Sequence, residues 1–238
     1  MWLSRTRLLI GDEAVSRLAA SRVVVFGVGG VGGYVVESLA RSGVGEIHLF
    51  DNDVVTLTNL NRQIVALRST LGLYKVDVAA DRIRDINPDC RVVPHRMFYL
   101  PENADEVDLS GFDYVADCID TVIAKVELIR RCRALNVPLI TCMGAAGKLD
   151  PTAFRVGDLS KTQVDPLAKA LRKRLRAEGI YHARCVWSEE IPIKAVQTTT
   201  ETSVTSRPIP PSNAFVPAAE GLVAASEIIK GLIATSKS

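Results

Sequence analysis

The stretch from Val23 to Ser42 joins an apolar, β-branched run to a glycine-rich turn and a helix-forming segment. Within it, Gly27, Gly29 and Gly32 satisfy the spacing G-x-G-x-x-G. The first glycine permits a tight turn, the second lets the backbone approach a phosphate, and the third lets the helix pack on the strand. Free N–H groups and the helix dipole favour an anion at the helix start. The stretch therefore predicts a strand–turn–helix unit that binds a nucleotide.

An acidic residue, Asp51, follows the second predicted strand at residues 46–50. A ribose-binding carboxylate belongs at about this distance beyond the glycine turn. The two features together indicate a nucleotide. They do not say which nucleotide, because dinucleotide dehydrogenases carry the same pattern.

Strands alternate with helices through the first part of the chain. The strands are predicted at 22–26, 46–50, 91–93, 114–116 and 139–143, and the helices at 31–41, 73–86 and 122–135. This alternation predicts an α/β fold: a doubly wound, mostly parallel, Rossmann-like sheet with right-handed crossovers. Residues 1–21 are expected to form a short arm followed by a helix.

The pattern changes after Gly147. Strands are predicted at 152–156 and 185–188 on either side of a basic helix, and a last helix at 218–234. The polar, proline-rich residues 197–213 between them are expected to form a mobile loop. We therefore expect a nucleotide-binding domain over residues 1–150. Residues 151–238 are expected to be an α+β extension packed on the same domain.

Composition narrows the functional class only a little. The net charge of +2 neither demands nor excludes nucleic acid. The chain has five cysteines and no C-x-x-C pair, so no zinc site is expected. The odd cysteine count, without a signal peptide, favours a cytoplasmic protein. Glu220, Glu227 and Lys230 interrupt the C-terminal apolar run, so no membrane span is expected.

Candidate ligand-binding residues converge at one edge of the predicted sheet. Ligands of doubly wound sheets bind beyond the carboxyl ends of the strands. Asp51, Asp120 and Gly144 each follow a predicted strand there, as the glycine turn does. This convergence is a stronger signal than a glycine turn alone.

Five motifs in order carry a resemblance over roughly residues 5–143. They are G-V-G-G-V-G, Asp51-x-Asp53, Thr58-Asn59-x-Asn61-Arg62-Gln63, Gly72-x-x-Lys75 and Cys118-Ile119-Asp120. The series resembles the ThiF/MoeB/HesA superfamily, the ATP-dependent adenylating enzymes related to ubiquitin-activating proteins. A dehydrogenase has no reason to carry the N-x-N-R-Q motif and the lysine downstream.

The resemblance implies a role for each residue that follows the first two strands. Gly29 and Gly30, in the turn that Gly27 and Gly32 shape, would lie under the ATP phosphates. Asp51 would hold the ribose hydroxyls. Asp53 would shape the same site. The alternative for Asp51 is a simple turn cap.

The resemblance also assigns the residues that meet the phosphates. Asn59, Arg62 and Lys75 would contact phosphate oxygens, with Gln63 beside them. Asp120 would coordinate or orient Mg²⁺ near the reacting phosphate, and is predicted to be catalytic together with Arg62 and Lys75. Taken singly, Arg62 could be a surface charge and Lys75 could lie on a solvated helix face.

Further stretches extend the resemblance over nearly the whole chain. They resemble the tRNA threonylcarbamoyladenosine dehydratases, and lie at 41–45, 86–92, 144–152, 158–162, 165–175, 185–190 and 212–222. The implied reaction is ATP-dependent cyclisation of the threonylcarbamoyl group on a tRNA adenosine, through an acyl-adenylate. The alternative is adenylation of the C-terminal glycine of a ubiquitin-like sulfur carrier, against which the missing C-x-x-C pairs count.

The basic helix predicts a surface for nucleic acid. Lys169, Arg172, Lys173 and Arg176 follow helical spacing and share one face, while leucines line another. A cationic stripe of this kind suits a phosphate backbone. The alternative is a solvated face, but acidic partners are scarce nearby.

Members of the superfamily usually pair as homodimers in which an N-terminal arginine reaches the partner's ATP. The resemblance gives this role to Arg5, with Arg7 as second choice, in an extended arm. Cys185 is expected to be a core thiol, with sulfur transfer as the alternative. The sequence leaves open a bound monovalent cation and a cysteine desulfurase with its sulfur acceptor as partners.

Overall fold

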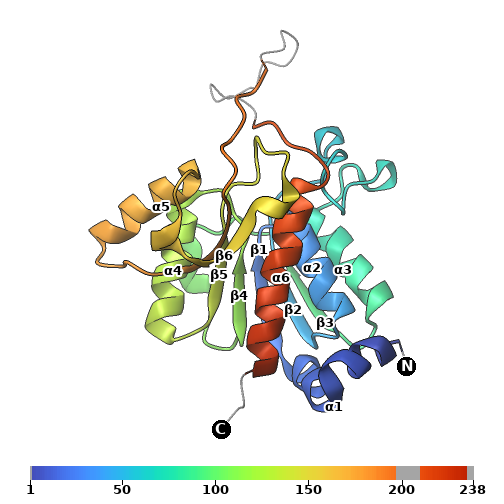
Figure 1. Ribbon diagram of the computed structural model, residues 1–238. Coiled ribbons are helices and arrows are strands. Elements are labelled where there is room, and N and C mark those ends of the chain that lie inside the picture. The colour runs from blue at the N-terminus through green and yellow to red at the C-terminus, as the bar shows by residue number, and fades with distance from the viewer. Residues whose placement is uncertain (1, 197–209, 235–238) are drawn as a thin grey trace.

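A seven-stranded sheet forms the centre of the computed structural model, which describes residues 2–196 and 210–234 (Figure 1). The strand order is β3-β2-β1-β4-β5-β7-β6, and every neighbouring pair is parallel except β6 with β7. The strands are β1 (Arg22–Phe26), β2 (Glu46–Phe50), β3 (Arg91–His95), β4 (Tyr114–Asp117), β5 (Leu139–Cys142), β6 (Phe154–Asp158) and β7 (Arg184–Ser188). The predicted doubly wound, mostly parallel α/β fold is confirmed.

Helices cover both faces of this sheet (Figure 1). They are α1 (Ser4–Ala20), α2 (Gly32–Arg41), α3 (Lys75–Ile86), α4 (Val122–Leu135), α5 (Pro166–Ala177) and α6 (Val216–Ala234). Alternation along β1 explains the two layers. Val23 and Val25 pack into the core under α2, α3 and α6, whereas Val24 and Phe26 pack into the core under α4.

The N-terminal segment differs from the expected arm. α1 begins at Ser4, so Arg5 and Arg7 lie in a helix, and the extended arm is wrong. The helix bends at Gly11, whose φ of 83° is a left-handed conformation that glycine adopts without strain. Arg7 forms an ion pair with Asp12 across this bend.

Small differences in element ends have local causes. β6 begins at Phe154 instead of residue 152, because a 3₁₀ turn at Pro151–Ala153 precedes it. The Asp150 side chain caps this turn by accepting the N–H of Thr152.

The predicted loop at 197–213 lies outside the described residues except for its last four. No helix in the described part of the chain is long and apolar enough to span a bilayer.

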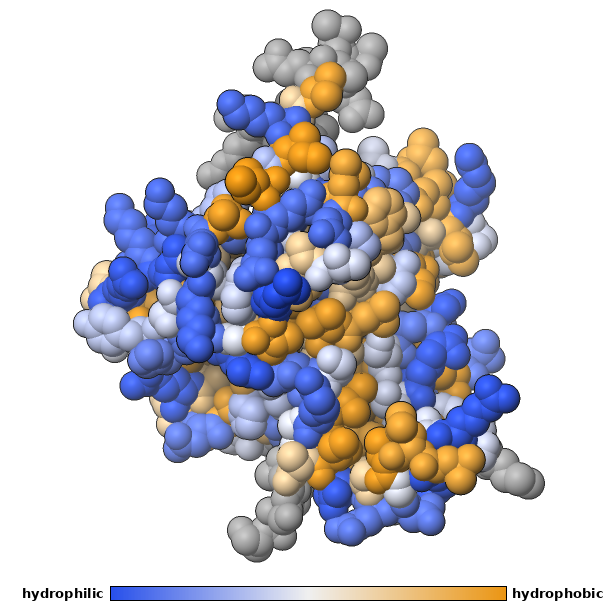
Figure 2. Space-filling model, in the orientation of Figure 1, coloured by the Kyte–Doolittle hydropathy of each residue, from blue (hydrophilic) through white to orange (hydrophobic). Residues whose placement is uncertain are grey.

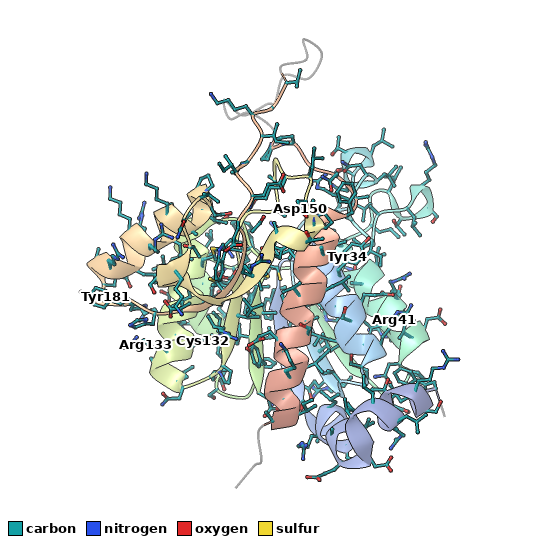
Figure 3. All side chains as sticks on the ribbon, viewed as in Figure 1. Tyr34, Arg41, Cys132, Arg133, Asp150 and Tyr181 are labelled. Carbon is teal, nitrogen blue, oxygen red and sulfur yellow. The ribbon has the colours of Figure 1, made fainter. Side chains whose placement is uncertain are left out.

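The last helix covers the first crossover helix. α6 packs against α2, and Tyr34 of α2 lies beside α6 in Figure 3. The approach is close, because a Cβ on Gly221 would lie 2.4 Å from the Val31 carbonyl oxygen. Pro217, one turn earlier, would lie 3.2 Å from a Cβ on Gly30 in the glycine turn. The C-terminal part of the chain therefore packs directly against the glycine turn.

Candidate functional site

A cavity of about 730 Å³ opens at the carboxyl ends of the parallel strands. Its volume is typical of a site for a small molecule or cofactor. The predicted residues that line it are Gly27, Gly29, Gly30, Asp51, Asp53, Asn59, Arg62, Gln63, Lys75 and Asp120. Gly144, which follows β5, lines it as well, so the fold brings together residues from four separate connections, as the convergence of the motifs predicted.

The glycine turn leaves no room for side chains at its two ends. A Cβ on Gly27 would lie 2.9 Å from the Cys118 carbonyl oxygen, and Gly27 has a φ of 88°. A Cβ on Gly32 would lie 1.8 Å from the Gly27 carbonyl oxygen. Gly29 faces open space instead, with Gln63 Nε2 as its nearest neighbour at 3.9 Å. The turn therefore presents bare backbone to the cavity at Gly29.

Asp51 is held toward the cavity by two backbone N–H groups. Its Oδ2 accepts the N–H of Val28 at 2.8 Å, and its Oδ1 accepts the N–H of Asp53 at 2.8 Å. Each carboxylate oxygen retains a second lone pair for a ligand hydroxyl. The carboxylate thus caps a turn and faces the cavity at once.

Lys75 opens α3 and is nearly buried, with 5% of its surface exposed. Its Nζ lies 2.6 Å from Asp53 Oδ2. A solvated position on a helix face is therefore excluded for Lys75. This ion pair holds the ammonium group of Lys75 at the edge of the cavity.

The N-x-N-R-Q motif begins at Asn59, the last residue of a 3₁₀ turn at Leu57–Asn59, and continues along the cavity wall. Asn59 is buried, and its Oδ1 accepts the Thr56 N–H at 3.0 Å. Arg62 Nη1 donates to the Thr58 carbonyl and to Asn61 Oδ1, at 3.0 and 2.9 Å. Asn61 in turn donates to the Ser212 carbonyl at 3.1 Å, which links the turn to the start of α6.

Gln63 offers an unpaired group to the cavity. It is 7% exposed, and its Oε1 is buried with no hydrogen-bond partner among the described residues. An unpaired buried polar atom costs about 1–3 kcal/mol. A ligand or water in the cavity would relieve this cost.

Asp120 lies beyond β4 with its carboxylate exposed to the cavity. Among the described residues its one recorded side-chain contact is a weak hydrogen bond from the Thr121 hydroxyl at 3.4 Å. No group of three or more His, Cys, Asp or Glu side chains in residues 2–196 and 210–234 could hold a metal by itself. A single free carboxylate nevertheless fits Mg²⁺, which is commonly held by one or two carboxylates and substrate phosphates.

Two buried lysines support this edge of the sheet, and sequence reasoning missed both. Lys125 of α4 lies 3.1 Å from Asp117 Oδ1 and donates to the Cys142 carbonyl at 2.7 Å. Lys148 lies 3.0 Å from Asp165 Oδ2 and also donates to the Gly144 carbonyl. Buried charges occur when they are paired. Both pairs join residues from different elements, so spacing along the chain gave no signal.

Glu220 of α6 is the third buried acid near these lysines. Its side chain is fully buried, and neither oxygen has a partner among the described residues. Burial raises its pKa to about 8, against the opposing influence of Lys148 and Lys125. Both lysines already have a carboxylate partner, so this arrangement favours a neutral, protonated Glu220 at neutral pH.

Apolar and aromatic side chains form part of the cavity wall. Met97, Phe98 and Tyr99 line the cavity after β3. Tyr99 packs edge-on against Phe26, with ring centroids 4.8 Å apart. No periodicity or motif singled out this segment from the sequence alone.

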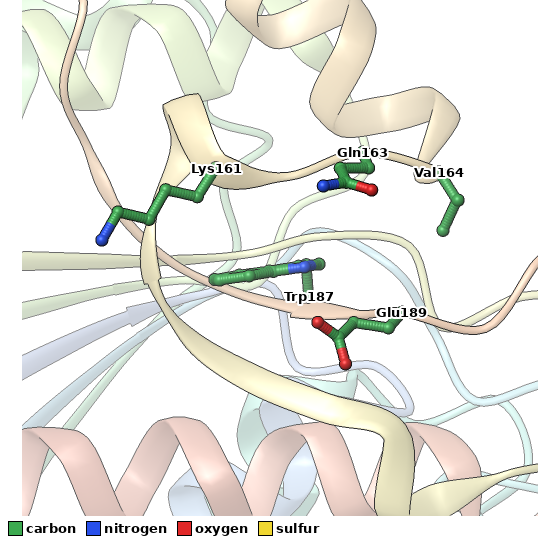
Figure 4. A pocket seen from close by; sticks show the side chains of 5 residues that line it. All are labelled: Lys161, Gln163, Val164, Trp187 and Glu189. Carbon is green, nitrogen blue, oxygen red and sulfur yellow. The ribbon is translucent and has the colours of Figure 1, made fainter.

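A second, smaller cavity of about 150 Å³ lies near the start of α5 (Figure 4). Lys161, Gln163, Val164, Trp187 and Glu189 line it. Trp187 is only 8% exposed, so it offers no full indole face on which a base could stack. This cavity shares no lining residue with the larger one.

The remaining predicted residues lie elsewhere. Lys169, Lys173 and Arg176 are exposed on α5, from which side chains project outward in Figure 3. Arg172 is turned inward instead, where it donates to the Thr162 hydroxyl. Arg5 is exposed on α1 and does not line the cavity of its own chain.

The thiol of Cys185 is fully buried in β7. Burial raises its pKa to about 12, so at neutral pH it is a thiol and not a nucleophilic thiolate. The expectation of a core cysteine agrees with this position.

The model of the ThiF family matches residues 3–238. The chain belongs to the ThiF family. It is 44% identical to the tRNA threonylcarbamoyladenosine dehydratase of Bacillus subtilis, over 97% of this chain and 94% of the relative.

Solved structures of an Escherichia coli relative have the same fold. Two of them show tRNA N6-threonylcarbamoyladenosine dehydratase, TcdA, one in complex with ATP and the other with AMP. Both are 40% identical to this chain, with TM-scores of 0.88 and 0.87. The matches cover 98% and 97% of this chain, and 93% of each solved chain.

Proposed function

We propose that this chain catalyses the ATP-dependent dehydration, by cyclisation, of the threonylcarbamoyl group of threonylcarbamoyladenosine in tRNA. The observation that carries the proposal is the match over nearly the full length of dehydratases of that name, including one solved with ATP. The cavity adds support, because the motif residues of the adenylating family line it together.

The reaction proceeds in two steps. The carboxylate of the threonylcarbamoyl group attacks the α-phosphorus of ATP, and the bond to pyrophosphate breaks, which leaves an acyl-adenylate. A neighbouring atom of the same modification then attacks the activated carbonyl carbon and expels AMP. The modification loses the elements of water. Because the second nucleophile is intramolecular, proximity supplies much of the rate and no cysteine is needed.

The side chains of the cavity bind and orient the nucleotide. Asp51 accepts hydrogen bonds from the ribose hydroxyls, and the backbone at Gly29 and Gly30 approaches the phosphates. Arg62 and Lys75 place positive charge where negative charge develops on the phosphates. Asp53 holds Lys75 in position. Asn59 and Gln63 complete this wall.

Asp120 would hold Mg²⁺ together with phosphate oxygens of ATP. When bound, the ion would neutralise charge on the phosphates as pyrophosphate leaves. The exposed carboxylate, free of ion pairs with the described residues, supports this role.

Nucleoside analysis of tRNA tests the proposal. The protein is incubated with ATP and tRNA that carries the modification, and the digested tRNA is examined by mass spectrometry. We expect a nucleoside lighter by one water, formed together with AMP and pyrophosphate. ATP turnover with a ubiquitin-like protein, and none with modified tRNA, would contradict the proposal and favour sulfur-carrier adenylation.

We further propose that two parts of the chain bind different ligands. Residues 1–150 bind ATP, and residues 151–238 add a surface for tRNA through α5. Lys169, Lys173 and Arg176 of α5 are exposed, and their side chains make no recorded ion pair with the described residues. With tRNA as substrate, the activity belongs to the cytoplasm.

Replacing Lys169, Lys173 and Arg176 together with glutamine is expected to weaken tRNA binding and flatten its salt dependence. Each lost phosphate contact should reduce the slope of log K against log salt by roughly 0.7 to 0.9. Arg172→Gln is the matched control, because Arg172 is held inward by Thr162 and should change the slope less. Binding titrations at several salt concentrations measure this slope. An unchanged slope in the triple variant would identify a merely solvated face.

A homodimer is the proposed assembly, with Arg5 reaching the ATP of the partner subunit. Arg5 is exposed and lies away from its own cavity, whereas Arg7 is already paired with Asp12. Leu8 and Leu9 are 88% and 84% exposed on α1, and Figure 2 shows an apolar patch over this helix. Sedimentation over a range of concentrations tests the pairing, and a monomer throughout would contradict it.

A further inference from the structure

Two cysteine thiols meet beside the nucleotide cavity, which Cys118 lines and the buried Cys142 does not. β4 and β5 are parallel neighbours with Asp117 opposite Thr141. The next positions place Cys118 opposite Cys142, and their sulfur atoms lie 3.9 Å apart, with the Cys118 thiol as hydrogen-bond donor. Neighbouring strands lie about 4.8 Å apart. This spacing falls within the range of about 4.4–6.8 Å between Cα atoms that a disulfide requires.

The two thiols differ in access and reactivity. Cys118 is partly exposed and lines the cavity. Cys142 is 3% exposed, and its hydrogen bond with Cys118 and its burial hold its pKa well above the usual value. An oxidant entering the cavity therefore meets Cys118 first. The other three cysteines are buried.

We propose that Cys118 and Cys142 form a reversible disulfide that weakens nucleotide binding in the cavity. With hydrogen peroxide as oxidant, the Cys118 sulfur attacks a peroxide oxygen, giving a sulfenic acid and one water. The Cys142 thiol then passes its proton to the sulfenic oxygen while its sulfur, in contact with Cys118, attacks the sulfenic sulfur. The S–S bond forms, the S–O bond breaks, and the oxygen leaves with the thiol proton as a second water. The two thiols lose two electrons, which the peroxide gains.

The position of Cys118 explains why the bond would affect nucleotide. Its N–H donates to the Phe26 carbonyl at 2.8 Å. Its carbonyl oxygen would lie 2.9 Å from a Cβ on Gly27, and its own Cβ 3.2 Å from one on Gly32. Pulling Cys118 toward β5 therefore disturbs the packing of the glycine turn, and it also displaces Asp120, two residues along.

Formation of the bond follows from the geometry of the strands alone, whereas its effect on ATP rests on the proposed function. The full chain is treated with hydrogen peroxide, its free thiols are alkylated, and its peptides are examined by mass spectrometry. We expect a linked pair of peptides containing Cys118 and Cys142, lighter by two hydrogens and separated by dithiothreitol.

Two variants sharpen this measurement. In Cys142→Ala the link cannot form, so Cys118 should gain oxygen or react with the alkylating reagent. Cys132→Ala removes a different buried thiol, on α4, and should leave the link intact. Recovery of Cys118 in oxygenated or alkylated form from folded wild-type protein, with no linked peptide, would overturn the proposal.

Binding of a fluorescent ATP analogue tests whether the disulfide weakens nucleotide binding. Oxidation should raise the Kd by about tenfold or more, and dithiothreitol should restore it in both the wild type and Cys132→Ala. A linked protein with unchanged Kd would overturn the regulatory part. Failure of the reduced protein to bind the analogue would count against the proposed function, while the linked peptide would still establish the thiol pair.

Discussion

Replacing Asp120 with asparagine is expected to lower kcat for ATP-dependent cyclisation by about 100- to 1000-fold, equivalent to roughly 2.7–4 kcal/mol of lost transition-state stabilisation. The carboxylate faces the cavity and supports no ion pair among the described residues. Asparagine keeps its shape and removes its charge. The free energy of unfolding should change by less than about 0.5 kcal/mol, as for other exposed positions.

Single-turnover formation of AMP with modified tRNA measures this effect, and thermal unfolding verifies the fold. Asp89→Asn is the matched control, because Asp89 is exposed just before β3, at the opposite end of the strands. It should retain wild-type kcat. If Asp120→Asn kept more than about a tenth of kcat, a loss of less than 1.4 kcal/mol, the proposed role of this carboxylate would be wrong.

Glu220 is expected to make the free energy of unfolding fall as pH rises toward 8. Its pKa is about 8 in the folded chain, against an ordinary value of 4.5. Between these values the folded protein holds a proton that the unfolded chain has released. The stability that depends on this proton is complete below pH 4.5 and is lost through pH 8, at up to about 1.4 kcal/mol per pH unit.

Comparison with Glu220→Gln isolates this contribution. Glutamine is neutral at every pH. The free energy of unfolding of the variant, relative to that of the wild type, should therefore rise steadily from about pH 5 to pH 8. The pKa values of His48 and His95 are lowered by burial and make stability rise with pH below 6.5, but both proteins share that slope. Denaturant titrations at several pH values give the difference, and parallel curves would show that Glu220 is not protonated in the folded chain.

Much of the fold follows from periodicity. Short β-branched runs alternate with helical segments, and α4 extends over the predicted residues 122–135. The N-terminus shows where this reasoning fails. The sequence predicts a short arm before the first helix, whereas in the fold that helix begins at Ser4 and bends at Gly11. A glycine can end a helix or bend one, and only the packing of the flanking segments decides between the two.

The convergence of the candidate residues on one cavity was predictable to the extent that they lie in ordered motifs. Asp51, Arg62 and Asp120 each follow a strand or stand within a motif, so topology alone brings them together. The pairs of Lys125 with Asp117 and of Lys148 with Asp165 could not be found this way. The first pair depends on which side of α4 faces the sheet, and the second on how the loop after β5 packs against the residue before α5. Local spacing fixes neither.

The position of α6 has a consequence for synthesis on the ribosome. β1 and the glycine turn leave the ribosome well before Pro217 and Gly221, which pack against that turn and α2. At about 5–20 residues per second, translation from α2 to α6 takes on the order of ten seconds or more. During that time the apolar face of α2 that α6 covers is exposed, so the nascent chain should be prone to aggregation, and a chain truncated before α6 should be insoluble.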